Sequence, residues 1–468
     1  MSKVVLGGGL SGLSAAYYAI NKFPNQVITL LEKSDRLGGW LKSTRQDDGS
    51  IFEQSARTIR PSGEAGANTL QLLNELGLNH EIVPILKNSP AALNRMIYVN
   101  GKLHLLPNSL GSLFKKQEPF SKPLYRYFLN DVFATKKKIV DNDESLYSFV
   151  DRRFGTEIAD YLISPMVCGI CGGNAKEISV KFLMKSIFEK EQEYGSVTRG
   201  IIADFFNKKE KVTPVYTQLE QRANTEKWSV YSFKNGIETL PNALRKEVSS
   251  KGVKIDLNQD IQEIEVHKKS ILVNKADGTV LLANHLISCI PALSLAPLLK
   301  KQHPYLSKML SSFETASMCV VNLKYNKKLL QQEGFGFLVA PKENLPLLGV
   351  IYDSCCFPYE DSTILTAMLG GFKFNTYFNE KTTAEEVLSI VTKNLEKILN
   401  ISDQPDNFKV SILNQCIPQY TVGHSKKIGL IEDYLRDNDL PLSLCGASYY
   451  GVGVNDVILS AKKAVDGL

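Results

Sequence analysis

Glycines near the start of the chain have the spacing of a nucleotide-binding turn. Segment 7–12 reads Gly-Gly-Gly-Leu-Ser-Gly, follows an apolar run at 3–6 and opens a stretch of helical character. In such a turn Gly7 allows the sharp bend, Gly9 lets the backbone approach a pyrophosphate, and Gly12 lets the helix pack closely on the strand. The N-terminus of the helix adds N–H groups and positive partial charge for the phosphates.

An acidic residue ends the second apolar run, where a ribose would need it. Residues 27–31 predict a buried strand that leads to Glu32, whose carboxylate can accept hydrogen bonds from a ribose diol. A glycine-rich loop that binds nothing is the alternative, but here strand, helix and acidic residue all stand where binding needs them. The sequence therefore predicts a βαβ unit that binds a dinucleotide, either FAD or NAD.

A second pair of glycines follows this acidic residue. Gly38 and Gly39 permit close approach of the backbone to a ligand, and Arg36 offers donors to a phosphate. The stretch 32–39, a Glu followed after four residues by Leu-Gly-Gly, resembles the flavin amine oxidase superfamily, in which such a segment wraps FAD. The resemblance implies FAD rather than NAD, held non-covalently because no flavin-linking motif is apparent.

The composition is that of an ordinary globular protein. The 468 residues, with 43% hydrophobic and 22% charged side chains, suggest about three domains at roughly 150 residues each. A net charge of +6 is too small to indicate nucleic acid, although it suits anionic lipid or an acidic substrate. Eight cysteines without regular spacing predict reduced thiols, and the lone CxxC pair at 168–171 predicts no metal site.

The sequence predicts no membrane-spanning helix and no cleavable leader. The first strand begins at Lys3, which leaves no room for a presequence. The longest apolar run, 286–299, is shorter than the ~20 residues that a spanning helix needs, and it contains two prolines. Any association with a membrane is therefore expected to be peripheral.

Several segments have the pattern of regular elements. Thr383 to Glu386 is a capping box ahead of a helical pattern, and 145–154 predicts a helix that Gly155 stops. A final helix is expected after Asp456. Short strands are expected at 254–257, 261–266, 270–274, 286–290 and 442–446.

A closer resemblance extends over nearly the whole chain. It rests on the joint order of motifs at 52–61, 94–99, 106–107, 152–155, 334–338, 350–354, 368–371, 417–420 and 446–456. In these motifs the chain resembles the protoporphyrinogen oxidase family of haem biosynthesis. The family reaction is the FAD-dependent oxidation of protoporphyrinogen IX to protoporphyrin IX, in which six electrons pass to molecular oxygen and hydrogen peroxide forms.

Other functions stay open beside this one. The substrate could be coproporphyrinogen III, oxidised to coproporphyrin III, or the chain could be another oxidoreductase of the amine oxidase type, such as a polyamine oxidase or a carotenoid desaturase. A flavin-free protein of the Rab-escort type has a related fold. In the family reaction a hydride moves from a tetrapyrrole carbon to flavin N5, so the resemblance implies no catalytic side chain. The six scattered histidines fit this, since none has metal-ligand spacing.

The resemblance implies an α/β fold with a discontinuous domain. We expect an FAD-binding, Rossmann-like domain of the amine oxidase type from residues 1–85, 225–297 and 408–468. A mixed-sheet substrate domain is expected at 86–105 and 298–407, with a helical, membrane-facing domain at 106–224.

The family's cofactor contacts transfer to matching positions here. They are Gly7, Gly8, Gly9, Leu10, Ser11, Gly12, Glu32, Arg36, Trp40, Ser55, Ala56, Arg57, Thr58, Ile261, Ala447, Val452, Gly453 and Val454. The helix after Val454 would aim its positive end at the flavin pyrimidine. Ser55-Ala56 stands where the family usually has Gly-Pro, so the assignment of the family's backbone contacts to these two positions is weaker.

The resemblance also implies a substrate site. Arg95 would pair with a propionate, Leu338 and Met368 would sandwich the macrocycle, and Gly169 would leave room for it. Without the resemblance, Arg95 would be an exposed arginine and the two apolar residues would be core. Cys168 stands where animal members tend to have Arg, which argues against a charge there.

Aromatic residues alternate with basic ones at 110–138. Such mixing suits a pair of helices at a membrane interface, and an amphipathic helix with a solvated basic face is the alternative. The family's helical domain docks on a bilayer, which favours the first. We expect a peripheral protein of the mitochondrial inner membrane if the source is eukaryotic, or of the cytoplasmic membrane if bacterial. A homodimer is possible, and no nucleic acid partner is expected.

Overall fold

A computed structural model describes residues 2–134, 143–206, 217–357, 359 and 361–468. The chain divides into two compact units, which are described separately. The first contains residues 1–86, 216–313 and 426–468, and the second contains 87–215 and 314–425.

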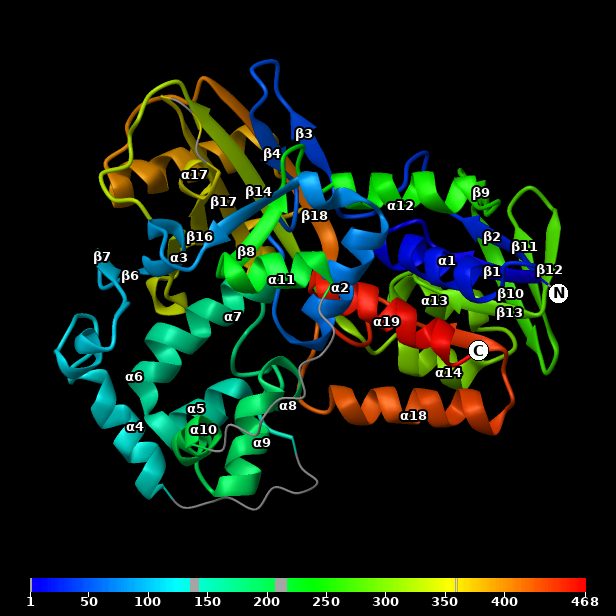
Figure 1. Ribbon diagram of the computed structural model, residues 1–468, viewed down its shortest axis with the longest axis horizontal. Coiled ribbons are helices and arrows are strands. Elements are labelled where there is room, and N and C mark those ends of the chain that lie inside the picture. The colour runs from blue at the N-terminus through cyan, green and yellow to red at the C-terminus, as the bar shows by residue number, and fades with distance from the viewer. Residues whose placement is uncertain (1, 135–142, 207–216, 358, 360) are drawn as a thin grey trace. The chain divides into compact units, whose positions relative to one another are not determined.

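A parallel five-stranded sheet forms the centre of the first unit (Figure 1). Its strand order is β19 (Leu442–Leu444), β13 (His285–Ser288), β1 (Ser2–Leu6), β2 (Val27–Leu31) and β9 (Lys254–Asp256). Apart from Val27 at the start of β2, the apolar residues of β1 and β2 are buried, as a sheet covered on both faces requires. The strand, turn, helix and strand predicted from 3–32 are therefore present.

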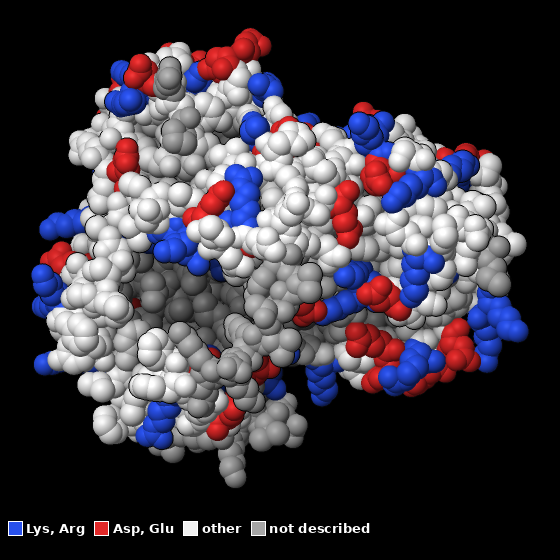
Figure 2. Space-filling model, in the orientation of Figure 1, with Lys and Arg blue, Asp and Glu red and all other residues white. Residues whose placement is uncertain are grey.

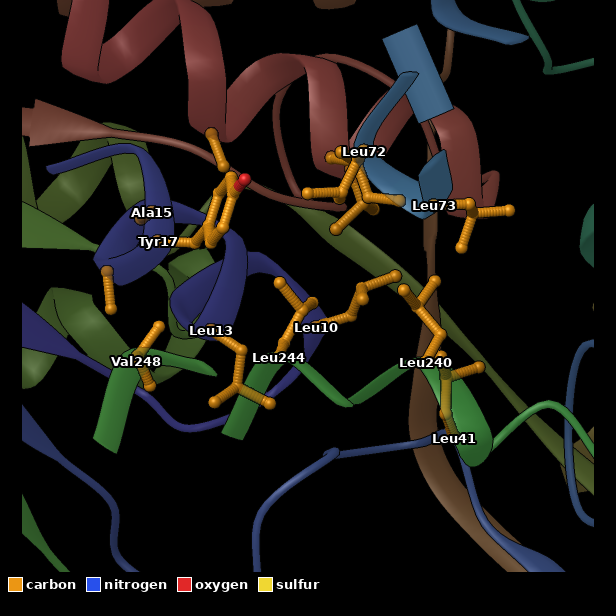
Figure 3. Packing of buried hydrophobic residues seen from close by; sticks show 14 of the residues in the cluster. Leu10, Leu13, Ala15, Tyr17, Leu41, Leu72, Leu73, Leu240, Leu244 and Val248 are labelled. Carbon is orange, nitrogen blue, oxygen red and sulfur yellow. The ribbon is translucent and has the colours of Figure 1, made fainter. Parts of the chain in front are cut away.

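Helices from distant parts of the chain cover this sheet. Helix α1 (Leu10–Lys22) packs against α12 (Thr239–Ser250) and α19 (Val454–Asp466), and α19 also packs against α2 (Gly63–Glu75). Figure 3 shows leucines of α1, α2 and α12 converging on one apolar cluster. The unit also contains α11 (Gln218–Thr225), α13 (Ala292–Leu299), α14 (Pro304–Leu310), most of α18 (His424–Asp437) and the short η1 (Leu78–His80).

Strands 261–283 form a sheet of their own. Of the strands in 225–297, which were expected in the nucleotide-binding domain, only β9 and β13 join the parallel sheet. β10 (Ile261–His267), β11 (Ser270–Lys275) and β12 (Val280–Ala283) pair antiparallel through short turns. Two further pairs are β3 (Ser43–Arg45) with β4 (Ile51–Glu53), and β5 (Ile82–Leu86) with β8 (Trp228–Phe233).

The second unit contains a mixed sheet of seven strands. Its order is β18 (Asn407–Gln419), β14 (Glu314–Tyr325), β17 (Thr363–Gly371), β16 (Leu347–Tyr352), β15 (Gly336–Val339), β6 (Met96–Val99) and β7 (Lys102–Leu105). All neighbours are antiparallel except β15 and β6. Helix α17 (Ala384–Leu399) packs on β14 and β18 and begins at the predicted capping box, in which Thr383 and Glu386 bind each other's backbone N–H.

Two predicted boundaries are wrong. Residues 408–419 were assigned to the nucleotide-binding domain, but they form β18 and pair with β14 along almost its full length. Residues 298–313 were assigned to the substrate domain, but α14 packs on α13 in the first unit. In both cases a long-range contact, invisible to local pattern, decides the unit to which the segment belongs.

Helices make up most of residues 106–206. They include η2 (Gly111–Phe114), α4 (Leu124–Phe133), α5 (Leu146–Phe154), α6 (Thr156–Ile158), η3 (Ala159–Ile163), α7 (Ser164–Cys171), α8 (Val180–Leu183), α9 (Lys185–Tyr194) and α10 (Val197–Phe206). The predicted helix α5 has Ser145 as its N-cap and ends at Gly155. Shorter elements elsewhere in the unit are α3 (Pro90–Leu93), η4 (Pro341–Glu343), α15 (Asp353–Cys356) and α16 (Phe374–Tyr377).

A buried ion pair joins these helices. The guanidinium of Arg153 on α5 donates to Asp131 of α4 at 2.6 Å, and both side chains are fully buried. The other oxygen of Asp131 accepts from the Ser196 hydroxyl at 2.7 Å and the Thr198 N–H at 2.6 Å, at the start of α10. Burial by itself would raise the pKa of Asp131, but these hydrogen bonds and Arg153 hold it below its usual value. One carboxylate therefore holds α4, α5 and α10 together.

Arg153→Ala should destabilise the second unit by about 3–5 kcal/mol, because it leaves the Asp131 carboxylate buried without its cation. Equilibrium denaturation by urea would measure this change. Arg126→Ala is the matched control, since Arg126 lies exposed on the neighbouring helix α4. Equal stability of the two variants would show that the buried pair contributes no more than a surface arginine.

Candidate active site

The turn after β1 has no room for side chains. A Cβ atom added to Gly12 would lie 1.7 Å from the carbonyl oxygen of Gly7, so α1 can approach the strand this closely only with glycine at that position. Gly7 has a φ of +103°, a backbone conformation that other residues rarely adopt. The first turn of α1 follows directly, and its N-cap, Gly9, offers no side chain to the helix N–H groups. These N–H groups suit an anion such as a phosphate.

Hydrogen bonds fix the carboxylate of Glu32 beside this turn. One oxygen accepts from the Gly8 N–H at 2.6 Å, and the other accepts from the Ser34 N–H at 2.9 Å and its hydroxyl at 2.7 Å. A carboxylate has about four lone-pair positions, so one remains for a hydroxyl of a ribose. The Glu32 carbonyl accepts from the Gln259 N–H at 2.8 Å, which brings the chain leading to Ile261 alongside. Neither Ser34 nor Gln259 could be identified from the sequence, because Gln259 acts through its backbone N–H and Ser34 partly through its own.

The second glycine pair lies against the first. The Gly38 N–H donates to the Gly8 carbonyl at 2.9 Å, and a parallel bridge joins Gly9 to Gly38. Arg36 holds this loop in place, since its guanidinium donates to the carbonyls of Leu37, at 2.8 Å, and Gly39. Contact of Arg36 with a phosphate stays a prediction.

The segment that contains Ser55 and Ala56, where the sequence differs from the family, lies against the end of that loop. The Ser55 hydroxyl donates to the Trp40 carbonyl at 2.8 Å, Arg57 is buried, and Ala56 and Thr58 are half-buried. Further along this segment, the carbonyl of Arg60 accepts a hydrogen bond from the distant Asn455 side chain at 2.8 Å. This bond ties segment 55–60 to the first turn of α19.

The C-terminal strand brings the last predicted residues to the same edge of the sheet. A Cβ atom added to Gly446 would lie 2.9 Å from the Ser11 hydroxyl, so the turn that contains Ala447 passes directly beside α1. Val452 and Gly453 precede α19, and Val454 is its first residue. Asp456, in that first turn, accepts from the Gly453 backbone, and burial raises its pKa. All predicted cofactor residues therefore lie in the first unit, most of them around the carboxyl ends of its parallel strands, where α/β sheets bind ligands.

Two predicted substrate residues share a row across the mixed sheet. Leu338 on β15 pairs with Gly349 on β16, and Gly349 pairs with Met368 on β17. Directly paired residues point to the same face, so Leu338 and Met368 flank a position that has no side chain. A Cβ atom at Gly349 would lie 3.0 Å from Leu338 Cδ2, which shows that Leu338 leans over the gap.

The other two predicted substrate residues belong to the same unit. Ile97 of β6 pairs with Leu338, and Arg95 lies in the loop just before β6. Arg95 is exposed, and its guanidinium lies 4.1 Å from the centre of the Phe335 ring. Gly169 on α7 faces Leu338, since a Cβ atom there would lie 2.6 Å from Leu338 Cδ2. In this structure Leu338 fills the space beside Gly169.

Cys168, next to that glycine, carries no charge at neutral pH. It is buried, and burial raises the pKa of its thiol to about 12. Its Sγ lies 3.5 Å from the Gly173 carbonyl oxygen. Within the ranges that the structure describes, no three His, Cys, Asp or Glu side chains are grouped to hold a metal ion.

Comparison with known proteins decides the family. The model of the flavin containing amine oxidoreductases matches residues 10–468. The chain belongs to this family. Among curated relatives, the protoporphyrinogen oxidase of Bos taurus is 38% identical and that of Homo sapiens 37%, each alignment covering 98% of this chain and 97% of the relative. The coproporphyrinogen III oxidase of Bacillus subtilis is 25% identical over 99% of this chain and 96% of the relative.

Solved structures have the same fold. One from Exiguobacterium superposes with a TM-score of 0.82 at 23% identity, over 100% of this chain and 98% of that one. A putrescine oxidase variant gives 0.69 at 14% identity over the same shares. The predicted α/β fold of the amine oxidase type is confirmed. The flavin that this family carries fits the glycine turn, the uncapped helix N-terminus and Glu32 of the first unit.

Glu32→Ala should weaken flavin retention, because a hydrogen bond to a charged acceptor contributes ~1.5–3 kcal/mol, or roughly ten- to a hundredfold in the dissociation constant. Titration of flavin-stripped protein with flavin, followed by fluorescence, would measure it. Asp35→Ala is the control, since Asp35 is an exposed acid in the same loop. Unchanged affinity in Glu32→Ala would remove the assigned role of this carboxylate.

Proposed function

We propose that the protein is an FAD-dependent oxidase that converts protoporphyrinogen IX to protoporphyrin IX. In this reaction six electrons leave the substrate in three cycles, and molecular oxygen accepts them to give hydrogen peroxide. The observation that carries the proposal is the 37–38% identity to animal protoporphyrinogen oxidases along almost the full length of both chains. Coproporphyrinogen III is the second candidate substrate, because curated enzymes named for it align over 99% of this chain at 25% identity.

The nucleotide site supports FAD as the flavin. A pyrophosphate needs the glycine turn and the start of α1, and an adenosine ribose needs an acid at the end of β2, where Glu32 stands. When bound, the flavin accepts a hydride from a carbon of the substrate. The start of α19 adds a positive partial charge, which favours negative charge near it.

The second unit supports a flat apolar substrate with a carboxylate. Leu338 and Met368 present aliphatic side chains on one face of the mixed sheet, and Arg95 is an exposed cation just before β6 of the same sheet. An arginine binds a carboxylate through two parallel hydrogen bonds, which fixes orientation as well as position. An amine oxidase would instead need an acidic or aromatic site for its cationic substrate. The chain's own residues thus bind and orient, while the chemistry belongs to the cofactor.

A fluorescence assay with both porphyrinogens tests this function. We expect porphyrin to form in the presence of oxygen, with hydrogen peroxide released, and the purified protein to be yellow. Acid precipitation should release the flavin into the supernatant, because it is held non-covalently. A folded, yellow protein that oxidises neither porphyrinogen but does oxidise an amine would overturn the proposal.

An apolar surface on two helices supports peripheral binding to a membrane. Helices α4 and α10 pack together, and both present large exposed side chains. These are Phe128, Leu129 and Phe133 on α4, and Ile201, Ile202, Phe205 and Phe206 on α10. On the face shown in Figure 2, the surface over α4 carries few acidic side chains, whereas charges of both signs cover α18. We call these seven residues the apolar helix pair.

The sequence pattern identified only part of this surface. It covered α4 but missed α10, and Lys136 to Lys138 lie outside the described residues. No helix in the described ranges is long and apolar enough to cross a bilayer. The apolar helix pair would therefore lie in the interface of the membrane. In a eukaryotic cell this membrane would be the mitochondrial inner membrane.

Arg95→Ala should reduce kcat/KM for the diacid porphyrinogen by roughly thirty- to a thousandfold, or ~2–4 kcal/mol, while flavin content stays unchanged. Arg95→Lys should recover only part of the loss, because an ammonium keeps the charge but not the planar fork. Steady-state kinetics would measure both variants. Wild-type kinetics for Arg95→Ala would mean that another group holds the propionate.

Phe133→Ser combined with Phe205→Ser should reduce binding to anionic vesicles, since these side chains are 81% and 69% exposed in the apolar helix pair. Vesicle co-sedimentation at several salt concentrations would measure it, and binding should fall as salt rises. Leu282→Ser is the control, because Leu282 is 60% exposed on β12 of the other unit. An equal loss in the control would refute this assignment.

A further inference from the structure

Two cysteines meet at the carboxyl ends of neighbouring strands in the first unit. The last residues paired in β13 and β19 are Ser288 and Leu444, and Cys289 and Cys445 follow them. The Cys445 N–H donates to the Ser288 carbonyl at 3.1 Å, so the two chains are still adjacent at this point. The two sulfur atoms lie 3.3 Å apart, and neither cysteine is bridged. The proposed oxidase reaction uses neither of them.

The geometry of this pair suits a disulfide. Neighbouring strands lie about 4.8 Å apart, within the range of Cα separations that disulfides span. The sulfur atoms would need to close from 3.3 Å to ~2 Å, a movement that small side-chain rotations supply. No refolding of the sheet is needed.

The surroundings make one sulfur of the pair nucleophilic. The Ser11 hydroxyl lies 3.3 Å from the Cys445 sulfur, in the first turn of α1, where the helix has positive partial charge. Hydrogen bonds from Cys289 and from Ser11 lower the pKa of Cys445, and burial opposes this shift. Cys445 is fully buried, and Cys289 is half-buried. Burial raises the pKa of the Cys289 thiol, so the negative charge rests on Cys445, which can accept the Cys289 proton across the 3.3 Å contact.

We propose that Cys289 and Cys445 form a modification site that hydrogen peroxide converts to a disulfide. The Cys289 thiol passes its proton to the Cys445 thiolate as its sulfur attacks one peroxide oxygen, the O–O bond breaks, and the departing hydroxide takes that proton from Cys445 to become water. Cys289 is then a sulfenic acid. The Cys445 thiolate attacks its sulfur, the S–O bond breaks, and a second water leaves. Two thiols lose two hydrogens, and one peroxide is reduced to two waters.

The choice of natural oxidant rests on the proposed function, because that reaction would release hydrogen peroxide from this same protein. The disulfide would also act on the nucleotide turn. A Cβ atom at Gly7 would lie 2.8 Å from Ile290, the neighbour of Cys289, so a shift of this strand end moves the turn. Ser11 would lose its thiol partner. Oxidation should therefore weaken flavin binding.

Peroxide treatment of the purified holoenzyme, without porphyrinogen, tests the site. We expect a mass loss of two hydrogens, one cross-linked peptide containing Cys289 and Cys445, reversal by dithiothreitol, and faster flavin release from the oxidised protein. Because the peroxide is added, failure of the oxidase proposal would leave this result unchanged.

Variants separate this pair from the other thiols. Cys289→Ala and Cys445→Ala should each abolish the cross-link, whereas Cys355→Ala, which alters one of two adjacent cysteines elsewhere, should leave it intact. Peptide mapping of the wild-type protein needs no variant to fold. Recovery of Cys289 and Cys445 as free thiols, or of Cys289 as a sulfinic acid without a cross-link, would overturn the proposal.

Discussion

The close contact between Gly12 and the Gly7 carbonyl is the constraint on which the first unit depends. It sets the distance between α1 and the parallel sheet, because any side chain at Gly12 would collide with the main chain. Helices α12 and α19 pack on α1, and α2 packs on α19, so their positions follow from it. The same contact directs the first turn of α1 at the edge where Glu32 and Cys445 lie. Ligand binding and core packing in this unit therefore share one backbone geometry.

In the second unit, side chains rather than backbone groups would contact the ligand. The proposed substrate site would be built from side chains on the face of a sheet, where strand register decides which residues become neighbours. The row from Leu338 through Gly349 to Met368 depends on the register of β15, β16 and β17, three consecutive strands of the chain. The first unit offers mainly backbone donors to phosphate, and the second offers aliphatic surface and one guanidinium. This division matches a cofactor that is constant within the family and a substrate that is not.

Local signals predicted local structure well. Strand β2, helix α5 and the capping box of α17 have the expected bounds or caps, because each depends on residues within a few positions of one another. The separate sheet of β10 to β12, the place of β18 beside β14 and the contact of α10 with α4 were not predicted. Each depends on partners chosen by long-range register. Arg36 illustrates the same limit at a site, since its charge suggested a phosphate while its bonds are to nearby carbonyls.

Gly349 also limits how the substrate face can evolve. A methyl group there would stand 2.7 Å from the Phe337 carbonyl and 3.0 Å from Leu338, so it would press on the main chain of β15 as well as on a side chain. A substitution at Gly349 would therefore change both the packing of the neighbouring strand and the shape of the proposed substrate face. A lineage that changed its substrate by filling this gap would need a compensating change in the neighbouring strand. Substitutions at Met368 are less constrained, because its side chain is only half-buried on the face of the sheet.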